Sequence, residues 1–352
     1  MKGEIVGKTI LITGGTGSIG SEIAKQALID KVKKVVIFSR DDIEQFLLKD
    51  KLSDRRLQTV VGDVKDIPSI EQVFKTYDID IIYHAAAMKH VVMCENFPIE
   101  AVKTNVLGTQ NIVDMAIKYG VPKMITISTD KAVYPANVMG AAKFLAERIT
   151  LNANTISKDH QIFSCVRFGN VASSRGSVIP VLMENLMNRK CLEITDREVT
   201  RFIMEIPDAV KLIIKSTDYV KGGEIFILKM KAFKLGDMLD VILNRIVTRL
   251  GMTKEQINVK EIGLVSGEKL HESILTDGEC NRLYKIDNMF VILPDHGCAD
   301  KYPGISNENL AKYCSNNVEL LSPVEIENMI VKYLNTLRFG LTKANLDLKN
   351  AN

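Results

Sequence analysis

Short apolar runs alternate with amphipathic stretches through the first half of this chain. Each apolar run has the length of one strand, and the stretches between the runs repeat apolar residues with the helical period. We predict strands at 8–12, 33–38, 57–61, 79–84, 123–128 and 161–167, and helices at 21–28, 42–51, 67–76, 98–119 and 138–154. This alternation is typical of a parallel sheet that helices cover on both faces, with ligands bound beyond the carboxyl ends of the strands.

The first strand leads into a glycine-dense turn, Gly14-Gly15-Thr16-Gly17-Ser18-Ile19-Gly20, which opens the first helix. Gly14, Gly17 and Gly20 let the backbone approach a ligand closely, and the first N–H groups of the helix attract negative charge. We therefore predict a dinucleotide site in which Gly14, Thr16, Gly17, Ser18, Ile19 and Gly20 contact the pyrophosphate. The alternative is an ordinary strand–helix turn.

The regular alternation ends near residue 170. Beyond it we predict helices at 207–216 and 233–250, strands at 222–228, 259–262 and 289–293, and a last helix of about four turns after the capping box Ser322–Glu325. The predicted fold class is α/β, a Rossmann-type doubly wound parallel sheet with a smaller C-terminal α/β lobe. We predict that residues 1–170 form the dinucleotide-binding domain and that residues 203–230 return to it. Residues 171–202 and 231–338 would form the smaller lobe. Residues 339–352 would form a frayed polar tail.

Composition excludes several classes of protein. The 352 residues are 46% hydrophobic and 25% charged, with a net charge of +3, as in ordinary globular proteins and unlike a nucleic-acid-binding protein. The six cysteines are scattered without a C-x-x-C pair, which favours a reducing cytoplasm over disulfides or a metal site. No signal peptide fits before the first strand, and no stretch has 18 consecutive apolar residues, so we expect a cytoplasmic protein without a membrane segment.

The ends of the second and third strands indicate which dinucleotide binds. Ser39-Arg40 follows the second strand, where an acidic residue would bind the ribose of NAD, and a cation there favours the 2′-phosphate of NADP. The alternative is a solvated arginine beside its aspartate neighbours. After the third strand, Asp63-Val64 places a carboxylate where it can meet the adenine amino group.

The fourth and fifth strands end in residues of two other kinds. Ala85, Ala86 and Ala87 are small, as expected where backbone lies against a cofactor, and we interpret the preceding His84 as a hydrogen-bonded strand-end residue. The fifth strand is followed by Ser128-Thr129-Asp130-Lys131, which sets an acid and a base side by side at the functional edge of the sheet. A solvated turn is the alternative for this pair.

These stretches together resemble a known family. The chain resembles the extended short-chain dehydrogenase/reductases and, more closely, the inverting UDP-N-acetylglucosamine 4,6-dehydratases of capsule, flagellar and surface-glycan biosynthesis. The matching stretches run in family order from residue 13 to 272: TGGTGSIG, FSRDD, GDV, HAAAMKHV, TNVLGT, STDKAVYP, MGAAK, RFGNVASSRGSVIP, VTRF, GGEIF and GEKLHE. The smaller lobe would then bind the substrate.

The resemblance implies a lyase that works by internal redox. NADP would take hydride from sugar C4, water would leave from C5 and C6, and hydride would return to C6. Lys131 resembles the base that acts at C5, and Asp130 the acid that protonates the departing hydroxyl. A lysine base needs a lowered pKa, which desolvation, Lys143 and the oxidised nicotinamide ring would provide.

The resemblance also implies the remaining contacts. Lys143 would hold the nicotinamide ribose. The other cofactor residues would be Gly14, Thr16, Gly17, Ser18, Ile19, Gly20, Ser39, Arg40, Asp63, Val64, Ala85, Ala86, Ala87 and Asn105. The substrate residues would be Lys89, His90, Thr129, Asn170, Arg175, Ser177, Arg201 and Glu268. The family further implies a homo-oligomer, a hexamer built from dimers, with no metal.

Two positions depart from the family pattern. Met139 stands four residues before Lys143, where the superfamily carries its tyrosine base, and Tyr134 is nine residues away from that lysine. A thioether exchanges no proton, so the acceptor of the 4-hydroxyl proton is left open. No arginine shortly precedes GEKLHE, so either Arg175 or Arg201 covers the diphosphate, or the nucleotide is not uridine.

Three functions remain compatible with these residues. The first is the dehydratase. The second is a nucleotide-sugar epimerase or reductase on the same fold, which would want the missing tyrosine and would not need Asp130-Lys131. The third is a non-catalytic NADP-binding regulator, which the loss of the tyrosine favours and the retained Asp130-Lys131 pair opposes.

Overall fold

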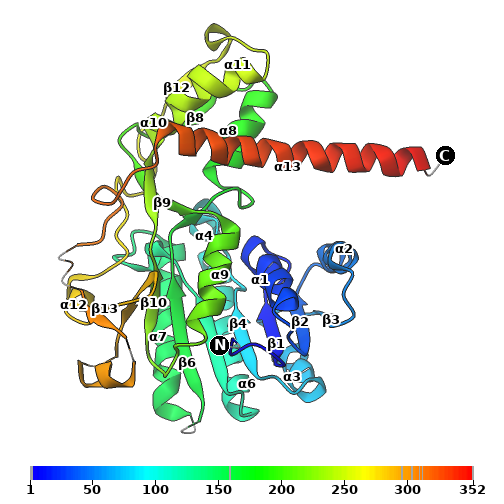
Figure 1. The fold of residues 1–352 in the computed structure, drawn as a ribbon, viewed down its shortest axis with the longest axis vertical. Helices are drawn as coiled ribbons and strands as arrows, with labels where there is room; N and C mark the ends of the chain where they lie inside the picture. The colour runs from blue at the N-terminus through cyan, green and yellow to red at the C-terminus, as the bar shows by residue number, and fades with distance from the viewer. Residues whose placement is uncertain are drawn as a thin grey trace. The chain divides into compact units, whose positions relative to one another are not determined.

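The chain forms two compact units (Figure 1). The computed structural model describes residues 3–157, 160–294, 296–302, 304–308, 310 and 312–350, with the backbone alone at 296–298 and 338–350. Unit 1 consists of Met1–Gly169, Ile206–Lys229 and Ser273–Cys314, and unit 2 of Asn170–Glu205, Met230–Glu272 and Ser315–Asn352. We predicted 231–338 as one part of the lobe, but its segment 273–314 belongs to unit 1, because three strands of this segment extend the sheet of that unit.

Unit 1 is built on one large sheet with the order β15-β13-β14-β10-β6-β5-β4-β1-β2-β3. Its parallel strands are β1 (Thr9–Thr13), β2 (Lys34–Ser39), β3 (Leu57–Val61), β4 (Ile81–His84), β5 (Lys123–Ile127), β6 (Ile162–Arg167) and β10 (Ile225–Leu228). The antiparallel strands β13 (Leu283–Ile286), β14 (Met289–Ile292) and β15 (Ser306–Asn307) lie beyond β10. The mostly parallel Rossmann-type sheet confirms the predicted fold class.

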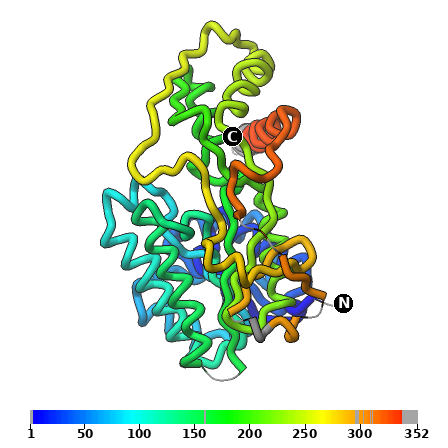
Figure 2. Tube along the Cα trace, turned by 90° about the vertical axis from the view of Figure 1, so that its left-hand side faces the viewer, coloured from blue at the N-terminus to red at the C-terminus, as the bar shows by residue number. Residues whose placement is uncertain are grey.

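Helices cover both faces of this sheet because alternate strand residues point to opposite sides. Leu11, Val36 and Ile82 belong to a hydrophobic cluster shared with α3 (Ile67–Thr76), α6 (Gly108–Lys118) and α7 (Val138–Ile156). The other face is covered by α1 (Ser18–Ile29) and α9 (Ile206–Ser216), which pack against each other. Figure 2 shows α6 and α7 side by side.

The strand register aligns the carboxyl ends that carry the candidate residues. Thr13 of β1 lies beside Phe38 of β2 and His84 of β4, and His84 lies beside Thr126 of β5. The turns and helices that follow these strands are therefore brought to one edge of the sheet. They are α2 (Asp42–Leu52), α4 (Val91–Asn96), α5 (Pro98–Ala101) and the short helix η2 (Asp130–Ala132).

The predicted helix at 98–119 contains a widened turn. Residues Val102–Leu107 form the π-helix η1 between α5 and α6, a feature that often marks functional positions. Apolar periodicity does not reveal such a turn, because the flanking helices continue in nearly the same direction.

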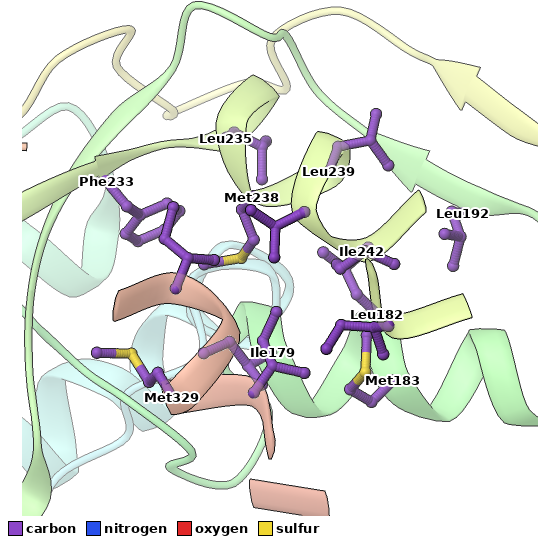
Figure 3. Packing of buried hydrophobic residues seen from close by; sticks show 14 of the residues in the cluster. Ile179, Leu182, Met183, Leu192, Phe233, Leu235, Met238, Leu239, Ile242 and Met329 are labelled. Atoms are coloured by element: carbon purple, nitrogen blue, oxygen red, sulfur yellow. The ribbon is translucent and has the colours of Figure 1, made fainter. Parts of the chain in front are cut away.

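Unit 2 is built around short strands and packed helices. Its strands are β7 (Asn170–Val171), β8 (Leu192–Ile194), β9 (Thr200–Met204), β11 (Lys231–Lys234) and β12 (Val259–Glu261), and its helices are α8 (Val178–Met187), α10 (Leu235–Val241), η3 (Ile242–Ile246), α11 (Val247–Arg249), η4 (Lys254–Gln256) and α13 (Pro323–Asn350). Figure 3 shows the core, where Ile179, Leu182 and Met183 of α8 meet Met238 and Ile242. Each fully buried apolar side chain of this kind contributes about 1.5–3 kcal/mol to the free energy of unfolding.

Two predicted elements of this unit differ from the structure. The helix predicted at 233–250 begins only at Leu235, because Phe233 lies in strand β11, paired with Arg201 of β9. The last helix begins at the predicted capping box, where the Ser322 N–H donates to Glu325, but it continues to Asn350 instead of ending after four turns. Leucine, lysine and alanine make up half of the predicted tail, and all three favour helix. Residues 351–352 lie outside the described residues.

Candidate functional site

The glycine turn forms a cradle with no room for side chains. Gly14 has a φ of +65°, and a Cβ atom there would lie 2.7 Å from the backbone of Ala86. A Cβ at Gly20 would lie 2.5 Å from the carbonyl oxygen of Gly14. Helix α1 then begins at Ser18 with no acidic residue in its first turn, so its N-terminus attracts an anion. This close approach fits the pyrophosphate of a dinucleotide.

The second and third strands end beside one another, and their polar residues interact. The Arg40 guanidinium lies 3.8 Å from the Asp63 carboxylate, and the side chain of Arg40 is 64% exposed. Ser39 is buried, and its hydroxyl accepts a hydrogen bond of 3.0 Å from the Gln45 amide. The Asp63 carboxylate also accepts a hydrogen bond from the backbone N–H of Lys65. A phosphate at this edge would therefore meet the Arg40 cation.

Two residues that we predicted as cofactor contacts form hydrogen bonds or packing contacts with other residues of the protein. The Asn105 side chain is buried in η1; its amide nitrogen donates to the Met88 carbonyl at 3.0 Å, and its oxygen accepts from the Met88 N–H at 2.7 Å. Asn105 therefore holds the loop after β4. Val64 packs in the core against Gly108, and its carbonyl accepts from Asn111. Both residues thus have partners within the protein, and their contacts with the cofactor stay a prediction.

His84 joins three elements below the cofactor edge. Its Nε2 lies 3.0 Å from the Thr109 hydroxyl, which itself donates to the Asn105 carbonyl, so Nε2 carries the hydrogen. Its Nδ1 accepts from the Thr13 hydroxyl at 2.7 Å. Burial, and then the nearby Lys143 charge, lower the pKa of His84 to about 3. His84 is thus a neutral, hydrogen-bonded strand-end residue, as we expected from the sequence.

The turn after β5 brings an acid and a base together in a nearly closed environment. The Asp130 side chain is 0% exposed and that of Lys131 is 19% exposed, and the Lys131 Nζ lies 3.1 Å from Asp130 Oδ1. The same oxygen accepts from the Thr129 hydroxyl at 2.8 Å. Asp130 Oδ2 is buried without a hydrogen-bond partner among the described residues. A buried carboxylate oxygen without a partner is costly, and a bound ligand would satisfy it.

Helix α7 positions this turn. Gly140 faces the turn so closely that a Cβ there would lie 2.3 Å from the Lys131 carbonyl oxygen. One helical turn further on, Lys143 is buried and its ammonium donates to the Ile127 carbonyl of β5. Burial lowers the pKa of Lys143. Lys143 therefore lies at the end of the same strand that carries Asp130.

Neither Met139 nor Tyr134 takes over the proton transfer of the missing tyrosine. Met139 is 4% exposed and packs with Cys94 and Ala101, so its thioether is part of a small hydrophobic cluster. Tyr134 lies beyond η2 with a φ of +44°, and its phenol oxygen accepts from the Asp277 N–H at 2.8 Å. Tyr134 thus fastens the end of the turn to helix α12 (Asp277–Cys280).

A buried ionic network supports the turn, and our sequence analysis did not identify it. Arg167 is 1% exposed and pairs with Glu147 of α7 at 2.7 Å and with Glu279 of α12 at 3.0 Å. Ser128, just before the turn, donates to Glu147 at 2.5 Å. Although burial opposes it, the charges of Glu147 and Glu279 raise the pKa of Arg167. The RFGNV stretch contained this signal, since an arginine ending a buried strand must have acidic partners.

The predicted substrate residues are divided between the two units. Lys89, His90 and Thr129 belong to unit 1, where Lys89 and His90 are exposed and burial, with the Lys89 charge, lowers the pKa of His90. The others belong to unit 2: Asn170, Arg175, Ser177, Arg201 and Glu268.

In unit 2 the structure brings two of these residues into direct contact. Arg201 on β9 pairs with Glu268 at 2.7 Å and also donates to the carbonyls of Thr200 and Leu270. Arg175 is exposed in the loop before α8. Ser177 caps that helix, and its buried hydroxyl has no hydrogen-bond partner among the described residues.

The described parts of the chain contain neither a membrane-spanning helix nor a cluster of metal-binding side chains. Within them no helix combines the length and apolar character needed to cross a membrane. The same residues contain no group of three or more histidine, cysteine, aspartate or glutamate side chains arranged to hold a metal ion.

Comparison with known proteins identifies the family. The family described as "Polysaccharide biosynthesis protein" matches residues 10–294. The chain belongs to this family. Within the polysaccharide biosynthesis proteins it is 37% identical over 298 residues to an inverting UDP-N-acetylglucosamine 4,6-dehydratase of Campylobacter jejuni, covering 84% of this chain and 85% of that one. The predicted membership of the extended short-chain dehydrogenase/reductases is thereby confirmed.

Other polysaccharide biosynthesis relatives carry different descriptions. A protein of Methanocaldococcus jannaschii described as an uncharacterized membrane protein is 45% identical over 82% of this chain and 86% of its own length. A UDP-glucose 4-epimerase of Rickettsia bellii is 35% identical over 93% of this chain and 96% of its own. The solved structure of Pen from Bacillus thuringiensis superposes with a TM-score of 0.86 at 36% identity, covering 94% of this chain and 99% of that one.

Proposed function

We propose that this protein is an NADP-dependent nucleotide-sugar 4,6-dehydratase that converts UDP-N-acetylglucosamine to a 4-keto-6-deoxy sugar with inversion at C5. The observation that carries the proposal is the buried Asp130–Lys131 pair with its unpartnered carboxylate oxygen. Moving hydride at C4 alone requires one acceptor for the 4-hydroxyl proton and no acid–base pair. Eliminating water requires a base for the C5 proton and an acid for the 6-hydroxyl. The identity to the Campylobacter jejuni dehydratase supports the same assignment.

The cofactor proposal rests on the cradle and on Arg40. Gly14–Gly20 would hold the pyrophosphate, Lys143 the nicotinamide ribose, and Arg40 the 2′-phosphate that distinguishes NADP. NADP, when bound, would accept hydride from C4 and return it to C6. If Lys143 holds the nicotinamide ribose, the oxidised ring would add a second positive charge beside its buried ammonium, and two such charges favour deprotonation of nearby bases.

The Asp130–Lys131 pair can supply both proton transfers. Lys131 in its neutral form takes the C5 proton, which the 4-ketone has made acidic. Asp130 gives a proton to the departing 6-hydroxyl, which leaves as water. After elimination the pair is an ammonium and a carboxylate 3.1 Å apart, the ion pair seen in the structure. A proton that reaches C5 from the face opposite to Lys131 inverts that carbon, and the Lys131 ammonium then gives its proton to solvent.

The proton balance also suggests to us which group accepts the 4-hydroxyl proton, because the thioether of Met139 cannot accept it. Over one turnover, the water formed contains the 6-hydroxyl and one further proton, and the 4-hydroxyl is the group that loses one. Asp130 must regain the proton that it gives away, and transfer of the 4-hydroxyl proton to Asp130 would restore it within the same turnover. Its Oδ2, which has no hydrogen-bond partner among the described residues, is the acceptor that we propose. Met139 then only packs.

Arg175 is the better candidate for the substrate diphosphate. Arg175 is exposed two residues before the cap of α8, and Arg201 is paired with Glu268 and donates to two carbonyls. A guanidinium recognises phosphate through paired hydrogen bonds. We therefore propose that Arg175 binds the diphosphate and that Arg201 orients Glu268.

We also propose that the protein is a cytoplasmic homo-oligomer built from dimers. Consecutive helices α4 to α7 expose apolar side chains, among them Val92, Phe97, Leu107, Phe144 and Leu145. Helices α4, α5 and η1 each contact α7, so these side chains come from neighbouring elements, as a broad interface requires. We call these five residues the α4–α7 face, and a second copy of the chain would cover it.

The decisive experiment follows UDP-N-acetylglucosamine by NMR with purified protein in D2O. We expect loss of water, deuterium at C5 and no net NADPH. Lys131→Ala should lower the rate about 10²- to 10⁴-fold while cofactor stays bound. Lys103→Ala, which removes an exposed lysine of η1, is the control and should leave the rate unchanged.

Each other product would reject the proposal. A 4-epimer would instead favour an epimerase, the activity named for the Rickettsia bellii relative. A Lys131→Ala protein that exchanges C5 at the wild-type rate would remove Lys131 from the mechanism. No turnover of any nucleotide sugar by the cofactor-loaded protein would favour a regulator.

The cofactor assignment has its own test. Arg40→Glu should bring a carboxylate to the end of β2 and shift the preference from NADP toward NAD, because it repels the 2′-phosphate and can bind the ribose hydroxyl. Binding of both dinucleotides by calorimetry measures the change. Equal preference in the wild type and Arg40→Glu would refute the role of Arg40.

A further inference from the structure

Arg167 uses every N–H group of its guanidinium inside the protein. Nε and one terminal nitrogen donate to the two carboxylate oxygens of Glu147, and both terminal nitrogens donate to the oxygens of Glu279. The remaining N–H donates to the Ile274 carbonyl at 2.9 Å. Because a planar guanidinium carries its donors in fixed directions, these partners are held in one geometry. Arg167 therefore joins helix α7, helix α12 and the chain before α12 to the end of β6.

The turn that carries the acid–base pair, residues 128–134, is bonded to this network; we call it the acid–base turn. The Asp130 N–H donates at 2.9 Å to the carbonyl of Phe168, the residue that follows Arg167. Ser128, at the start of the turn, donates through its hydroxyl to Glu147. The first half of the turn is thus held by groups that Arg167 itself fixes.

Helix α12 also holds the far end of the acid–base turn. Its first residue, Asp277, donates its backbone N–H to the Tyr134 phenol oxygen at 2.8 Å. Tyr134 has a φ of +44°, which is uncommon and costly for a bulky side chain and persists only where the surroundings hold it. Two residues after Asp277, Glu279 reaches Arg167. One short helix therefore contacts the turn directly at its end and through Arg167 at its start.

The contact between α12 and Arg167 is an ionic one. Burial opposes ionisation of Glu279, but the Arg167 charge outweighs burial and lowers the pKa of Glu279. The Arg148 guanidinium lies 3.9 Å from Glu279 and 3.8 Å from Glu147, so two arginines balance two carboxylates. Loss of the Glu279 charge would leave the buried Arg167 with one carboxylate in place of two, which weakens its hold on α12.

We propose that helix α12 positions the acid–base turn and that Glu279 is its positioning residue. Glu279 acts through Arg167, so that Asp130 and Lys131 meet the substrate in one geometry. This role rests on the proposed dehydration, because it serves the proton transfers that we assign to that pair. A displacement of about 1 Å can cost about 10²-fold in rate. The cradle Gly14–Gly20 follows another strand, β1, so cofactor binding should not change.

The first test compares two buried carboxylates of unit 1. Glu279→Gln removes the charge and keeps the size of the side chain. Glu224→Gln is the matched control, since Glu224 is buried and accepts hydrogen bonds from Ser164 of β6 and from Tyr302. Both variants should lower the melting temperature. Only Glu279→Gln should lower kcat, by about 10- to 100-fold, with the KM for UDP-N-acetylglucosamine within about twofold of the wild type.

The kinetic comparison is made at a temperature where circular dichroism shows both variants folded. Equal losses of kcat in Glu279→Gln and Glu224→Gln would overturn the proposal and would mean that the network only stabilises the fold. Weaker cofactor binding by Glu279→Gln, measured by calorimetry, would also overturn it.

A second test needs no substrate and therefore separates this proposal from the proposed function. Amide hydrogen exchange, followed by mass spectrometry on peptides that cover residues 128–134, reports local opening of the turn. Glu279→Gln should speed this exchange at least about tenfold, and Glu224→Gln should not. Unchanged exchange in Glu279→Gln would overturn the positioning role even in an active dehydratase. Faster exchange in a protein that leaves UDP-N-acetylglucosamine unchanged would reject the dehydratase and support the hold of α12 on the turn.

Tyr134→Phe is the milder variant and releases the other contact. Tyr134 is 49% exposed, so removal of its phenol oxygen leaves the core intact. Without the hydrogen bond from Asp277, exchange of the turn should rise about threefold or more, and kcat should fall with it. A Tyr134→Phe protein with the exchange and kcat of the wild type would overturn the role of α12 at the end of the turn.

Discussion

At the scale of single residues, His84 shows how this fold changes the chemistry of a side chain. Its ring bridges Thr13 and Thr109 and stays neutral, because protonation would require a buried charge without an acidic partner. The histidine therefore contributes to stability only while it is uncharged. Its pKa falls from 6.5 in the unfolded chain to about 3 in the folded protein.

This difference predicts a pH dependence of stability. The unfolded chain binds a proton below pH 6.5 and the folded protein does not, so the contribution is complete above pH 6.5 and is lost as the pH falls toward 3. Between pH 7.5 and 5 the wild type should lose about 2 kcal/mol more than His84→Gln, which does not titrate. Urea unfolding at both pH values measures it. The same loss in both proteins would contradict the neutral assignment.

Single residues also show where sequence reasoning reaches its limit. Asn105 and Val64 lie in stretches typical of the family, yet the structure uses one to hold Met88 and the other to fill the core. A motif indicates that a residue type is needed at a position but does not say whether the ligand or the protein uses it. Arg167 shows the reverse case, because its two acidic partners come from distant parts of the chain.

At the scale of elements, the contact between α7 and η2 determines where the acid–base pair lies. Gly140 allows the helix to touch the Lys131 carbonyl, and Lys143 on the same helix reaches β5. The turn is therefore held from one side by a helix without a side chain at the contact point. Any added atom at Gly140 must push the turn away.

We predict that Gly140→Ala disrupts this arrangement. The new methyl group would lie 2.3 Å from the Lys131 carbonyl oxygen, and relieving the overlap should cost about 1–3 kcal/mol and displace the pair. We expect at least about tenfold lower turnover and a lower melting temperature. Gly278→Ala, at a helical glycine with open space around it, is the control. Full activity of Gly140→Ala would show that the turn can shift without consequence.

The elements differ in how far the sequence predicts them. The parallel strands are continuous apolar runs between helices of regular period, and β3 and α3 have the bounds that we predicted. In unit 2, strands such as β7 and β8 have two or three residues, too few to show an alternation. They form because β9 and β12 come from elsewhere in the chain to pair with them. Such long-range pairing leaves no local pattern.

At the scale of the whole molecule, the exposed α4–α7 face predicts association. Leu145→Glu puts a charge into the proposed interface and should lower the mass measured by light scattering to that of smaller species. Ile29→Glu, an equally drastic change at an exposed position of α1, should leave the mass unchanged. If Leu145→Glu keeps the wild-type mass, this face is not the interface.

The chain passes between its two units at residues 169, 205, 229, 272 and 314, so neither unit is a continuous stretch of the gene. A single recombination between this gene and that of a relative therefore cannot exchange one unit whole. A crossover near residue 230 would combine β10 of one parent with β13 and β14 of the other within one sheet. A fragment that ends at 272 would leave the edge of β10 uncovered and prone to aggregate. Exchange of unit 2 between relatives would therefore need crossovers at all five of these points.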